Sequence, residues 1–274
     1  MTVWINGTLL ADSEARVSVF DHGLTVGDGV FETVKVVAGV PFALTRHLAR
    51  LRRSAAGLGL PEPDLGRLRA GVRHLLAAAD QPARARLRIT VTGGESPLGS
   101  DRGTAGLTVM AALGDWPSIG ASSDVVTVPW PRNDRGALAG LKTTSYAENV
   151  LALGYARDRG GNEAIFANTG GNLCEGTGTN VFVVSGGRLL TPPLSSGCLA
   201  GVTRGLVIEW AGAEEEDLAL GALGAAGEAF LTGTTRDVQP IRAVNGVPLP
   251  AAPGPATCRA AEIFAARSAA EPDP

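Results

Sequence analysis

The sequence predicts an α/β (α+β) protein with two domains, because strand and helix patterns alternate along both halves of the chain and an irregular segment separates them. The chain has 274 residues, of which 45% are hydrophobic and 19% are charged, so it can fill a sizeable core. Residues 113–122 show neither the alternation typical of a strand nor the apolar spacing typical of a helix, and they contain proline and glycine. We therefore expect a smaller N-terminal domain at residues 1–112, a linker at 113–122 and a larger C-terminal domain at 123–274.

The N-terminal half begins with a predicted β-hairpin, because Asn6 and Gly7 form a strong two-residue turn signal between two short apolar runs. Alternating apolar residues predict further strands, and apolar residues three and four apart predict amphipathic helices. Arg86 and Arg88 share one face of a predicted strand. The expected strands are residues 30–37, 86–91 and 106–113, and the expected helices are residues 45–58 and 65–79.

The C-terminal half repeats the same mixture of patterns. Strands are expected at residues 124–130, 163–169 and 227–235, with a hairpin at 180–193. Helices are expected at residues 144–160, 201–213 and 256–269. The final four residues, 271–274, contain two prolines and two acidic residues, and we expect them to be disordered.

Composition excludes several classes of function. The formal net charge is -3 and the basic residues are scattered, so we expect no nucleic-acid partner. No apolar run approaches the roughly 20 residues that span a bilayer, and the first residues lack a signal-peptide pattern, which favours the cytoplasm. Three widely spaced cysteines fit neither a disulfide framework nor a metal site, so we expect reduced structural thiols and no bound metal.

Lys142 is the first candidate for chemistry, because the sequence has only two lysines, Lys35 and Lys142. Taken alone, it is more typical of an ordinary lysine that precedes a helix. The glycines before it suggest a phosphate-binding loop, but the spacing of the G-x-x-x-x-G-K-[ST] motif is not met. We therefore reject a nucleoside triphosphatase.

Three further segments carry polar groups next to glycine. Glu175 lies in NLCEGTGTNVF, beside a glycine and threonine turn. GVTRG opens a predicted helix and TGTTRD follows a predicted strand, so backbone N–H groups and threonine hydroxyls could bind a single phosphate. The competing interpretation of Glu175 is an ordinary hairpin carboxylate. The competing interpretation of the other two segments is that their threonines are ordinary helix N-caps. GLTVGDGVFET lacks the third glycine of a dinucleotide-binding motif.

Taken together, these segments resemble the fold-type IV enzymes that depend on pyridoxal phosphate (PLP). This is the class IV aminotransferase family, which includes D-amino-acid aminotransferase, branched-chain aminotransferase and aminodeoxychorismate lyase. Six stretches match in family order across nearly the whole chain: GDGVFETVKV, LTRHLARLRRSA, LKTTSYAENVLA, EAIFANTGGNLCEGTGTNVF, GVTRGLVIEWA and LTGTTRDVQPI. The resemblance implies the two-domain architecture of D-amino-acid aminotransferase, pyridoxal 5'-phosphate as cofactor and a homodimer.

The resemblance also implies residue roles. Lys142 would carry the cofactor as a Schiff base and would move a proton at the substrate Cα, which requires a neutral amine. Glu175 would pair with the pyridine nitrogen. A guanidinium matches a phosphate better than an ammonium does, so Arg46 would bind the cofactor phosphate. The remaining expected cofactor contacts are Val202, Thr203, Thr234, Thr235 and, on the cofactor phenolic oxygen, Tyr146.

The substrate residues are less constrained by the resemblance. Phe31 falls where the family places an aromatic side chain beside the substrate, and Thr33 would point to the same side of the strand. Arg88 on its strand, or Arg102 in the following loop, would hold a substrate carboxylate. Each arginine could equally be a solvated surface residue.

The shared motifs leave the reaction open, because the pocket decides which substrate bond is broken. The leading hypothesis is a transaminase that moves an amino group from D-amino acids, with (R)-amines as a further class, to a 2-oxo acid. The alternatives are an aminodeoxychorismate lyase that forms 4-aminobenzoate and pyruvate, and a branched-chain L-amino-acid transaminase. A non-catalytic PLP carrier is the hypothesis from another class, and it would bind the cofactor without turnover.

Overall fold

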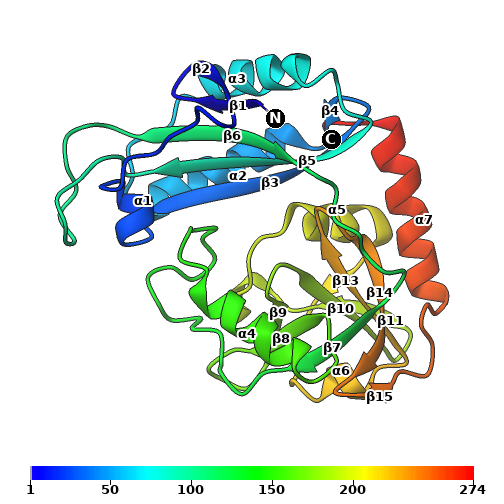
Figure 1. Cartoon of the computed structure of the whole chain (residues 1–274). Helices are drawn as coiled ribbons and strands as arrows, with labels where there is room; N and C mark the ends of the chain where they lie inside the picture. Colours follow the sequence, from blue (N-terminus) through cyan, green and yellow to red (C-terminus); the bar gives the residue numbers. More distant parts are fainter. Residues whose placement is uncertain (1) are drawn as a thin grey trace. The chain divides into compact units, whose positions relative to one another are not determined.

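The computed structural model describes residues 2–274 and divides them into two compact units (Figure 1). The N-terminal unit comprises the chain as far as Pro117, together with the segments Leu141–Ser145 and Glu271–Pro274. The C-terminal unit comprises Ser118–Gly140 and Tyr146–Ala270. The first division therefore falls inside the segment expected to be a linker, but two later segments return to the N-terminal unit. One of them carries Lys142.

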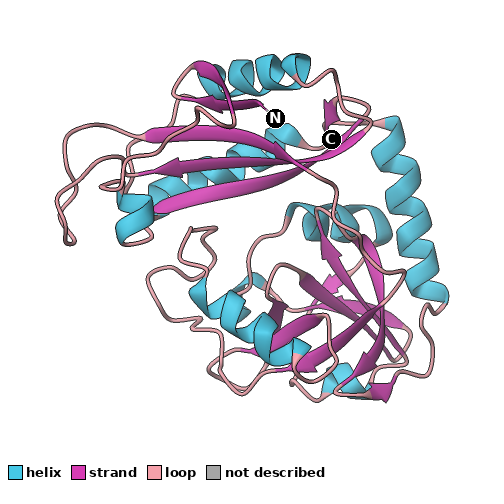
Figure 2. Ribbon diagram, viewed as in Figure 1, coloured by secondary structure: helices cyan, strands magenta, loops and turns pink. Residues whose placement is uncertain are grey.

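Among the residues that the structure describes, the N-terminal unit is centred on a six-stranded antiparallel sheet (Figure 2). Its strand order is β2-β1-β6-β5-β3-β4. The predicted hairpin turn is confirmed, because Asn6 and Gly7 both have positive φ, at 49° and 103°. The strands are β1 (Thr2–Ile5), β2 (Thr8–Ala11), β3 (Gly29–Val37), β4 (Val40–Pro41), β5 (Arg84–Thr92) and β6 (Thr108–Gly114).

Helices α2 (Leu44–Gly57) and α3 (Leu65–Ala78) pack against this sheet, and the short α1 (His22–Thr25) precedes β3. Asp64 caps α3 by accepting a hydrogen bond from the N–H of Arg67. Because side chains alternate along a strand, Val30, Val34 and Val36 of β3 join the core formed with the two helices. The residues between them, which include Phe31 and Thr33, point to the opposite face. We call this opposite face the Phe31 face.

The C-terminal unit, within the described residues, is centred on a nine-stranded sheet. Its principal strand order is β12-β11-β10-β13-β14-β7-β8-β9, and β15 pairs with β14. β7 runs parallel to both β14 and β8. The strands are β7 (Ser123–Thr127), β8 (Glu163–Ala167), β9 (Leu173–Gly176), β10 (Asn180–Ser185), β11 (Arg188–Thr191), β12 (Glu214–Glu215), β13 (Glu228–Gly233), β14 (Asp237–Val244) and β15 (Val247–Pro248).

The helices of the C-terminal unit pack on its strands. α4 (Ala147–Arg157) contacts β7 and β8, whereas α5 (Val202–Ala211) and α7 (Pro255–Ala270) contact each other and β13. The remaining helices are the 3-10 turn η1 (Leu194–Ser196) and α6 (Ala222–Ala225). Phe182 and Phe230 stack across β10 and β13 with ring centroids 4.9 Å apart. No helix in residues 2–274 has the length and apolar character needed to cross a membrane.

Three local expectations differ from the structure. α4 begins at Ala147 with Tyr146 as its N-cap, so Lys142 lies in extended chain rather than one helical turn before Tyr146. The strand β14 was not among the predicted strands; it contains Pro240, and its first residue, Asp237, has a φ of 51°. The expected disorder of residues 271–274 is wrong, because this segment forms hydrogen bonds with α2.

Candidate active site

Lys142 lies on an extended segment that is fixed to the start of β3. The backbone N–H of Phe31 donates to the Lys142 carbonyl at 3.0 Å, and the N–H of Thr144 donates to the Gly29 carbonyl at 2.8 Å. The Lys142 N–H donates to Oγ of Ser54 on α2 at 3.1 Å. Three hydrogen bonds from two elements therefore determine where the Lys142 backbone lies, which the sequence did not predict.

The Lys142 side chain lies over the ring of Phe31. Its Nζ is 4.2 Å from the ring centroid, and Cζ of Arg88 is 3.3 Å from the same centroid. Thr33 is the direct cross-strand partner of Arg88 in the β3–β5 register. The structure thus brings together four predicted site residues on the Phe31 face, with a primary amine and a guanidinium beside one aromatic ring.

A buried ionic cluster lies on the helix face of the same strand. Glu32 Oε2 is 2.6 Å from Nδ1 of His47 and 2.7 Å from the nearer terminal nitrogen of Arg50, and Nε of Arg50 donates to Oε1 at 2.8 Å. Burial alone would raise the pKa of Glu32, but Arg50 and His47 outweigh it and hold this pKa at about 2. Burial lowers the pKa of His47, although Glu32 opposes that shift.

Sequence reasoning missed this cluster, although the signal was present. Glu32 occupies a buried position in an otherwise apolar strand face, and His47 and Arg50 are three residues apart on one helix. A buried carboxylate requires such partners, because an unpaired charge in a protein core is costly. The cluster ties β3, which carries Phe31, to α2, which carries Ser54 and Arg46.

Arg46, the expected phosphate ligand, lies in the first turn of α2 and is half-buried. Its Nε donates to the backbone oxygen of Pro274 at 2.9 Å. This position near the N-terminal end of a helix suits an anion-binding residue, because the helix dipole adds positive potential there.

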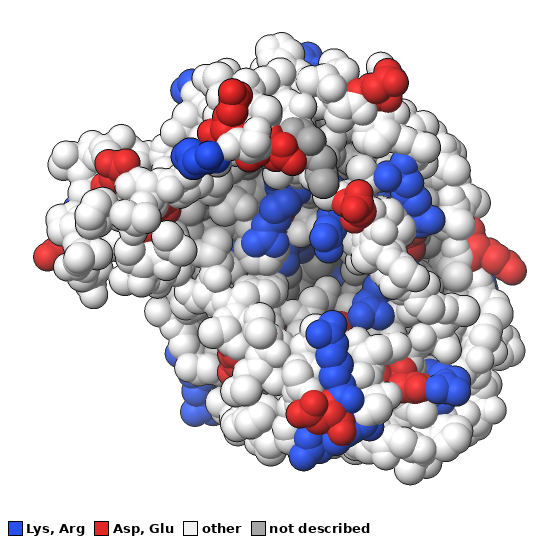
Figure 3. Space-filling view, viewed as in Figure 1, with Lys and Arg blue, Asp and Glu red and all other residues white. Residues whose placement is uncertain are grey.

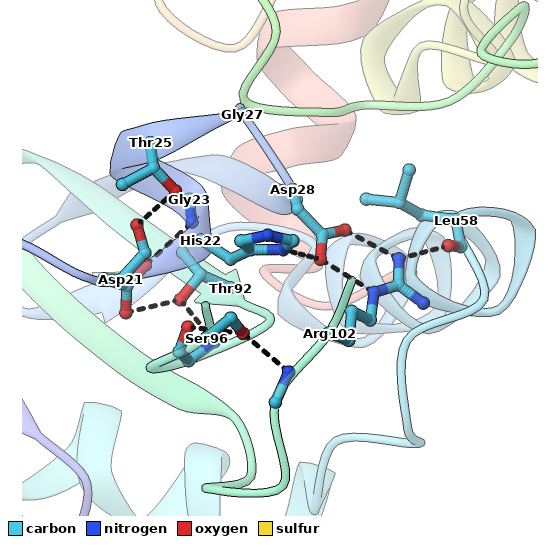
Figure 4. A network of polar contacts seen from close by, with 12 residues as sticks. Asp21, His22, Gly23, Thr25, Gly27, Asp28, Leu58, Thr92, Ser96 and Arg102 are labelled. Atoms are coloured by element: carbon cyan, nitrogen blue, oxygen red, sulfur yellow. Dashed lines mark hydrogen bonds and ion pairs between the residues drawn. The ribbon is translucent and has the colours of Figure 1, made fainter. Parts of the chain in front are cut away.

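Arg102, the second candidate for a substrate carboxylate, is engaged within the N-terminal unit (Figure 4). Its Nε and one terminal nitrogen form a two-pronged ion pair with Asp28, at 2.7 and 2.6 Å. Its terminal nitrogens also donate to the carbonyls of Leu58 and Gly59. These contacts connect the loop after β5 to the end of α2, and they leave the prediction that Arg88 or Arg102 binds a substrate carboxylate untested.

The same network includes His22, whose Nδ1 is 3.0 Å from Asp28 Oδ2 (Figure 4). Nε2 of His22 is 2.9 Å from the Gly99 carbonyl. The hydrogen bond from Arg102, followed by that of His22, lowers the pKa of Asp28. The hydrogen bond to Asp28 raises the pKa of His22. Asp28, from the GDG motif, therefore organises the loop that contains Gly99 and Arg102.

Glu175 lies on β9 in the C-terminal unit and is anchored at both carboxylate oxygens. Oε1 is 3.2 Å from Nε of Arg132, and Oε2 accepts a hydrogen bond from the N–H of Leu199 at 2.9 Å. The Arg132 contact is an ion pair rather than a hydrogen bond, because its N–H is not directed at the oxygen. A carboxylate held in this way can present a fixed negative charge to a ligand.

Arg132 was not predicted as a site residue, because nothing in the sequence indicates its partner. One terminal nitrogen of Arg132 donates to Oδ1 of Asn149 at 2.8 Å, and its Cζ lies 4.0 Å from the centroid of the Phe166 ring. A second ion pair joins it to Glu148. The guanidinium is therefore fixed from several sides, and this fixes Glu175 in turn.

The other expected cofactor contacts of the C-terminal unit lie at the start of α5 and after β13. Val202 and Thr203 are buried in the first turn of α5, whose N-cap, Gly201, provides no side-chain hydrogen bond. A Cβ at Gly201 would lie 2.0 Å from Oδ1 of Asn180, so a larger residue there would require the Asn180 side chain to move. Thr234 and Thr235 form the turn that follows β13, and Tyr146 caps α4.

Comparison with known proteins identifies the family. A family model described as amino-transferase class IV matches residues 29–244. The chain belongs to the class IV aminotransferases. It is therefore an enzyme whose cofactor is pyridoxal 5'-phosphate, and its fold is that of the fold-type IV enzymes.

Three relatives of the chain carry three different names. A Methanocaldococcus jannaschii protein named among the branched-chain-amino-acid aminotransferases is 34% identical over 255 residues, which cover 90% of this chain and 88% of the relative. The D-alanine aminotransferase of Bacillus licheniformis is 30% identical, with 94% and 93% coverage. The aminodeoxychorismate lyase of Bacillus subtilis is also 30% identical, with 93% and 90% coverage.

Solved structures agree with this assignment. Escherichia coli branched-chain amino acid aminotransferase matches with a TM-score of 0.91 at 27% identity, covering 97% of this chain and 93% of that one. The branched-chain enzyme of Thermoproteus uzoniensis, solved with norvaline, matches with a TM-score of 0.91 at 31% identity, with the same coverage of 97% and 93%. A third branched-chain enzyme, complexed with N-(5'-phosphopyridoxyl)-L-glutamate, matches with a TM-score of 0.88 at 27% identity, covering 96% and 92%.

The residues of this chain fit the cofactor. Lys142 offers a primary amine, Glu175 a fixed carboxylate, and Arg46 a guanidinium in the first turn of a helix. Buried Thr203 at the start of α5 adds a hydroxyl beside an N-cap that lacks a side chain. Lys142 and Arg46 belong to the N-terminal unit, and Glu175 and Thr203 belong to the C-terminal unit, so each unit supplies groups whose chemistry suits the cofactor.

Proposed function

We propose that this enzyme transfers the amino group of apolar, branched-chain L-amino acids to 2-oxoglutarate. The observation that carries the apolar donor and the 2-oxoglutarate acceptor is the amine and the guanidinium beside Phe31, where Lys142 Nζ lies 4.2 Å and Arg88 Cζ 3.3 Å from one ring centroid. An aromatic ring suits an apolar side chain. A guanidinium beside the reactive amine suits the second carboxylate of glutamate or 2-oxoglutarate.

Each residue then has a distinct role. Bound pyridoxal 5'-phosphate supplies an electron-accepting ring that stabilises negative charge at the substrate Cα. Lys142 Nζ binds the cofactor and moves the proton at the substrate Cα. Glu175, oriented by Arg132 and the Leu199 N–H, holds a proton on the pyridine nitrogen. The proposed phosphate ligands are Arg46, Val202, Thr203, Thr234 and Thr235. The proposed ligand of the phenolic oxygen is Tyr146.

Arg88 is the proposed carboxylate ligand in preference to Arg102. Arg88 lies on the Phe31 face beside the Lys142 amine, whereas Asp28 already neutralises Arg102. Moving Arg102 onto a substrate would cost its two-pronged ion pair and its bonds to two backbone carbonyls.

The sequence alone favoured D-amino acids as donors, whereas this proposal ranks branched-chain L-amino acids first. Several of the similar proteins and structures bear the name of branched-chain enzymes, and one of the structures was solved with a glutamate derivative of the cofactor. D-amino-acid transamination is the second candidate, because D-alanine aminotransferase is 30% identical over 94% of the chain. The groups beside Phe31 suit either enantiomer, so the names of the branched-chain relatives support ranking the L-donors first.

A single panel of reactions separates the candidates. The holoenzyme is incubated with 2-oxoglutarate and either L-leucine, L-valine or D-alanine, and chiral chromatography resolves L- from D-glutamate. We expect L-glutamate from the L-donors. D-glutamate from D-alanine alone would favour the second candidate, and 4-aminobenzoate formed from aminodeoxychorismate without any transamination would identify a lyase. Cofactor binding without any product would indicate a carrier.

We also propose that the enzyme is a homodimer. Large apolar side chains are exposed in the segment before and within α1, where Val19, Phe20 and Leu24 expose 69%, 52% and 68% of their surface. Such a grouping is typical of a surface that another protein covers. Sedimentation equilibrium of Phe20→Asp, compared with Val247→Asp outside this segment, tests this surface. Dimers in both variants would contradict it.

The cytoplasm is the compartment that we propose. Cys174, Cys198 and Cys258 are free thiols in the described chain, which is typical of a reducing compartment. Burial raises the pKa of both Cys174 and Cys198, so these thiols stay protonated and suit a structural role. Charged side chains of both signs are interspersed over the face shown in Figure 3, in keeping with the small net charge of -3.

A further inference from the structure

The last residues of the chain form a defined contact with α2 inside the N-terminal unit. The N–H of Thr45 donates to Oδ1 of Asp273 at 2.7 Å, and the Thr45 hydroxyl donates to Oδ2 at 2.5 Å. The N–H of Ala43 donates to the Pro272 carbonyl at 2.6 Å. Arg69 of α3 adds an ion pair, with its nearer terminal nitrogen 3.7 Å from Asp273 Oδ2.

These contacts replace a cap that α2 lacks. The residue at its N-cap position is Ala43, which has a φ of 52° and no side chain able to accept a hydrogen bond. The first N–H groups of a helix have no partner within the helix, and aspartate is among the best residues for capping them. Asp273 performs this function for Thr45, although 228 residues separate the two in sequence.

The capped turn also contains Arg46. This residue follows Thr45 directly, and its Nε donates to the Pro274 backbone oxygen at 2.9 Å. A bond at Nε orients the planar guanidinium, whose terminal nitrogens form the fork that suits a phosphate. The same short segment therefore holds both the backbone before Arg46 and the base of the Arg46 guanidinium.

We propose that Pro272, Asp273 and Pro274 are positioning residues for the cofactor phosphate, and that they act by capping α2 and orienting Arg46. The proposal rests on the phosphate role of Arg46 given above. It assigns a part in cofactor retention to a segment that is distant in sequence from every cofactor ligand. Asp273 acts through Arg46 and does not itself touch the cofactor.

The test compares Asp273→Ala with Glu271→Ala. Glu271 is exposed and carries the same charge two residues earlier, so its replacement is a matched control. PLP is titrated into the apo-protein, and the dissociation constant is read from the cofactor absorbance. We expect Asp273→Ala to weaken PLP binding roughly 3- to 30-fold, the range expected for loss of one helix cap. Glu271→Ala should match the wild type.

Two further readouts separate positioning from a general structural effect. In apo Asp273→Ala, hydrogen exchange should increase in a peptide spanning residues 43–48 and stay unchanged elsewhere. At saturating PLP, kcat should equal that of the wild type, and Asp273→Asn should recover part of the affinity through its remaining acceptor oxygen. Equal PLP affinity in Asp273→Ala and Glu271→Ala would overturn the proposal.

Arg46→Ala distinguishes failure of this proposal from failure of the premise. Unchanged PLP affinity in Arg46→Ala would remove the phosphate role of Arg46 and this proposal with it. Weakened binding in Arg46→Ala, combined with wild-type binding in Asp273→Ala, would overturn the positioning role alone. The PLP titrations and the hydrogen-exchange measurement do not depend on which amino acid is the substrate.

Discussion

Arg132 Nε lies 3.2 Å from Oε1 of Glu175, and the two side chains are only 15% and 13% exposed. An ion pair so far removed from water leaves an uncompensated charge when one partner is lost. Arg132→Gln should therefore weaken PLP binding and lower kcat, each by roughly 10-fold or more, the effect of about 1.4 kcal/mol. Cofactor titration and steady-state kinetics measure the two effects.

Arg135→Gln is the matched control for this prediction. Arg135 lies three residues further along the same segment, but its side chain is exposed. A comparable loss of cofactor affinity in both variants would mean that the Glu175 contact is not the cause.

The two lysines of the chain should differ completely in their chemistry. Lys142→Ala should abolish turnover and the visible absorbance of the bound cofactor, because its amine is the proposed attachment point. Lys35→Arg should retain both, since Lys35 lies beside Phe42, with its Nζ 4.9 Å from the ring centroid. Borohydride treatment followed by peptide mapping should label Lys142 only. A label on Lys35, or an active Lys142→Ala enzyme, would refute the assignment.

Replacement of Arg88 should affect substrate binding, whereas replacement of Arg102 should affect the stability of a loop. Arg88→Ala should raise KM for 2-oxoglutarate roughly 10-fold or more through loss of a charge-assisted contact. Arg102→Ala should change this KM little, but it should increase proteolysis of the loop near Gly99, because the contact with Asp28 is lost. Kinetics and limited proteolysis on both variants test the assignment, and the reverse pattern would exchange the two roles.

Removal of the buried Glu32 carboxylate should lower the free energy of unfolding and leave substrate specificity unchanged. Glu32→Gln leaves Arg50 buried without its counter-charge, which typically costs about 3–5 kcal/mol. Urea unfolding should show a lower midpoint than in Glu62→Gln, since Glu62 is 73% exposed and forms only a long ion pair with Arg52. Equal midpoints would show that the Glu32 cluster is energetically neutral.

The same carboxylate predicts acid sensitivity. The pKa of Glu32 in the folded protein, about 2, lies below its ordinary value of 4.5, so the unfolded chain binds more protons between these values. The contribution of Glu32 to stability is therefore complete above pH 4.5 and is lost as the pH falls toward 2. Unfolding free energies measured from pH 6 to pH 3 should fall less steeply in Glu32→Gln than in the wild type.

Local patterns predicted most of the elements but not the tertiary contacts. Asn6-Gly7, the alternation in β3 and the apolar spacing of α2 each report a property of neighbouring residues, and those predictions are confirmed. The partner of Glu175 could not be predicted, because Arg132 is 43 positions away and no spacing rule connects them. The ion pair of Arg102 with Asp28 could not be predicted either, because the two residues are 74 positions apart.

The path of the chain has a practical consequence. It leaves the N-terminal unit after Pro117, returns for Leu141–Ser145, and returns again for Glu271–Pro274. No continuous stretch of the gene therefore encodes either unit complete. An expression fragment that stops at Pro117 would lack Lys142 and the aspartate that caps α2, so the whole chain must be expressed to obtain either unit intact.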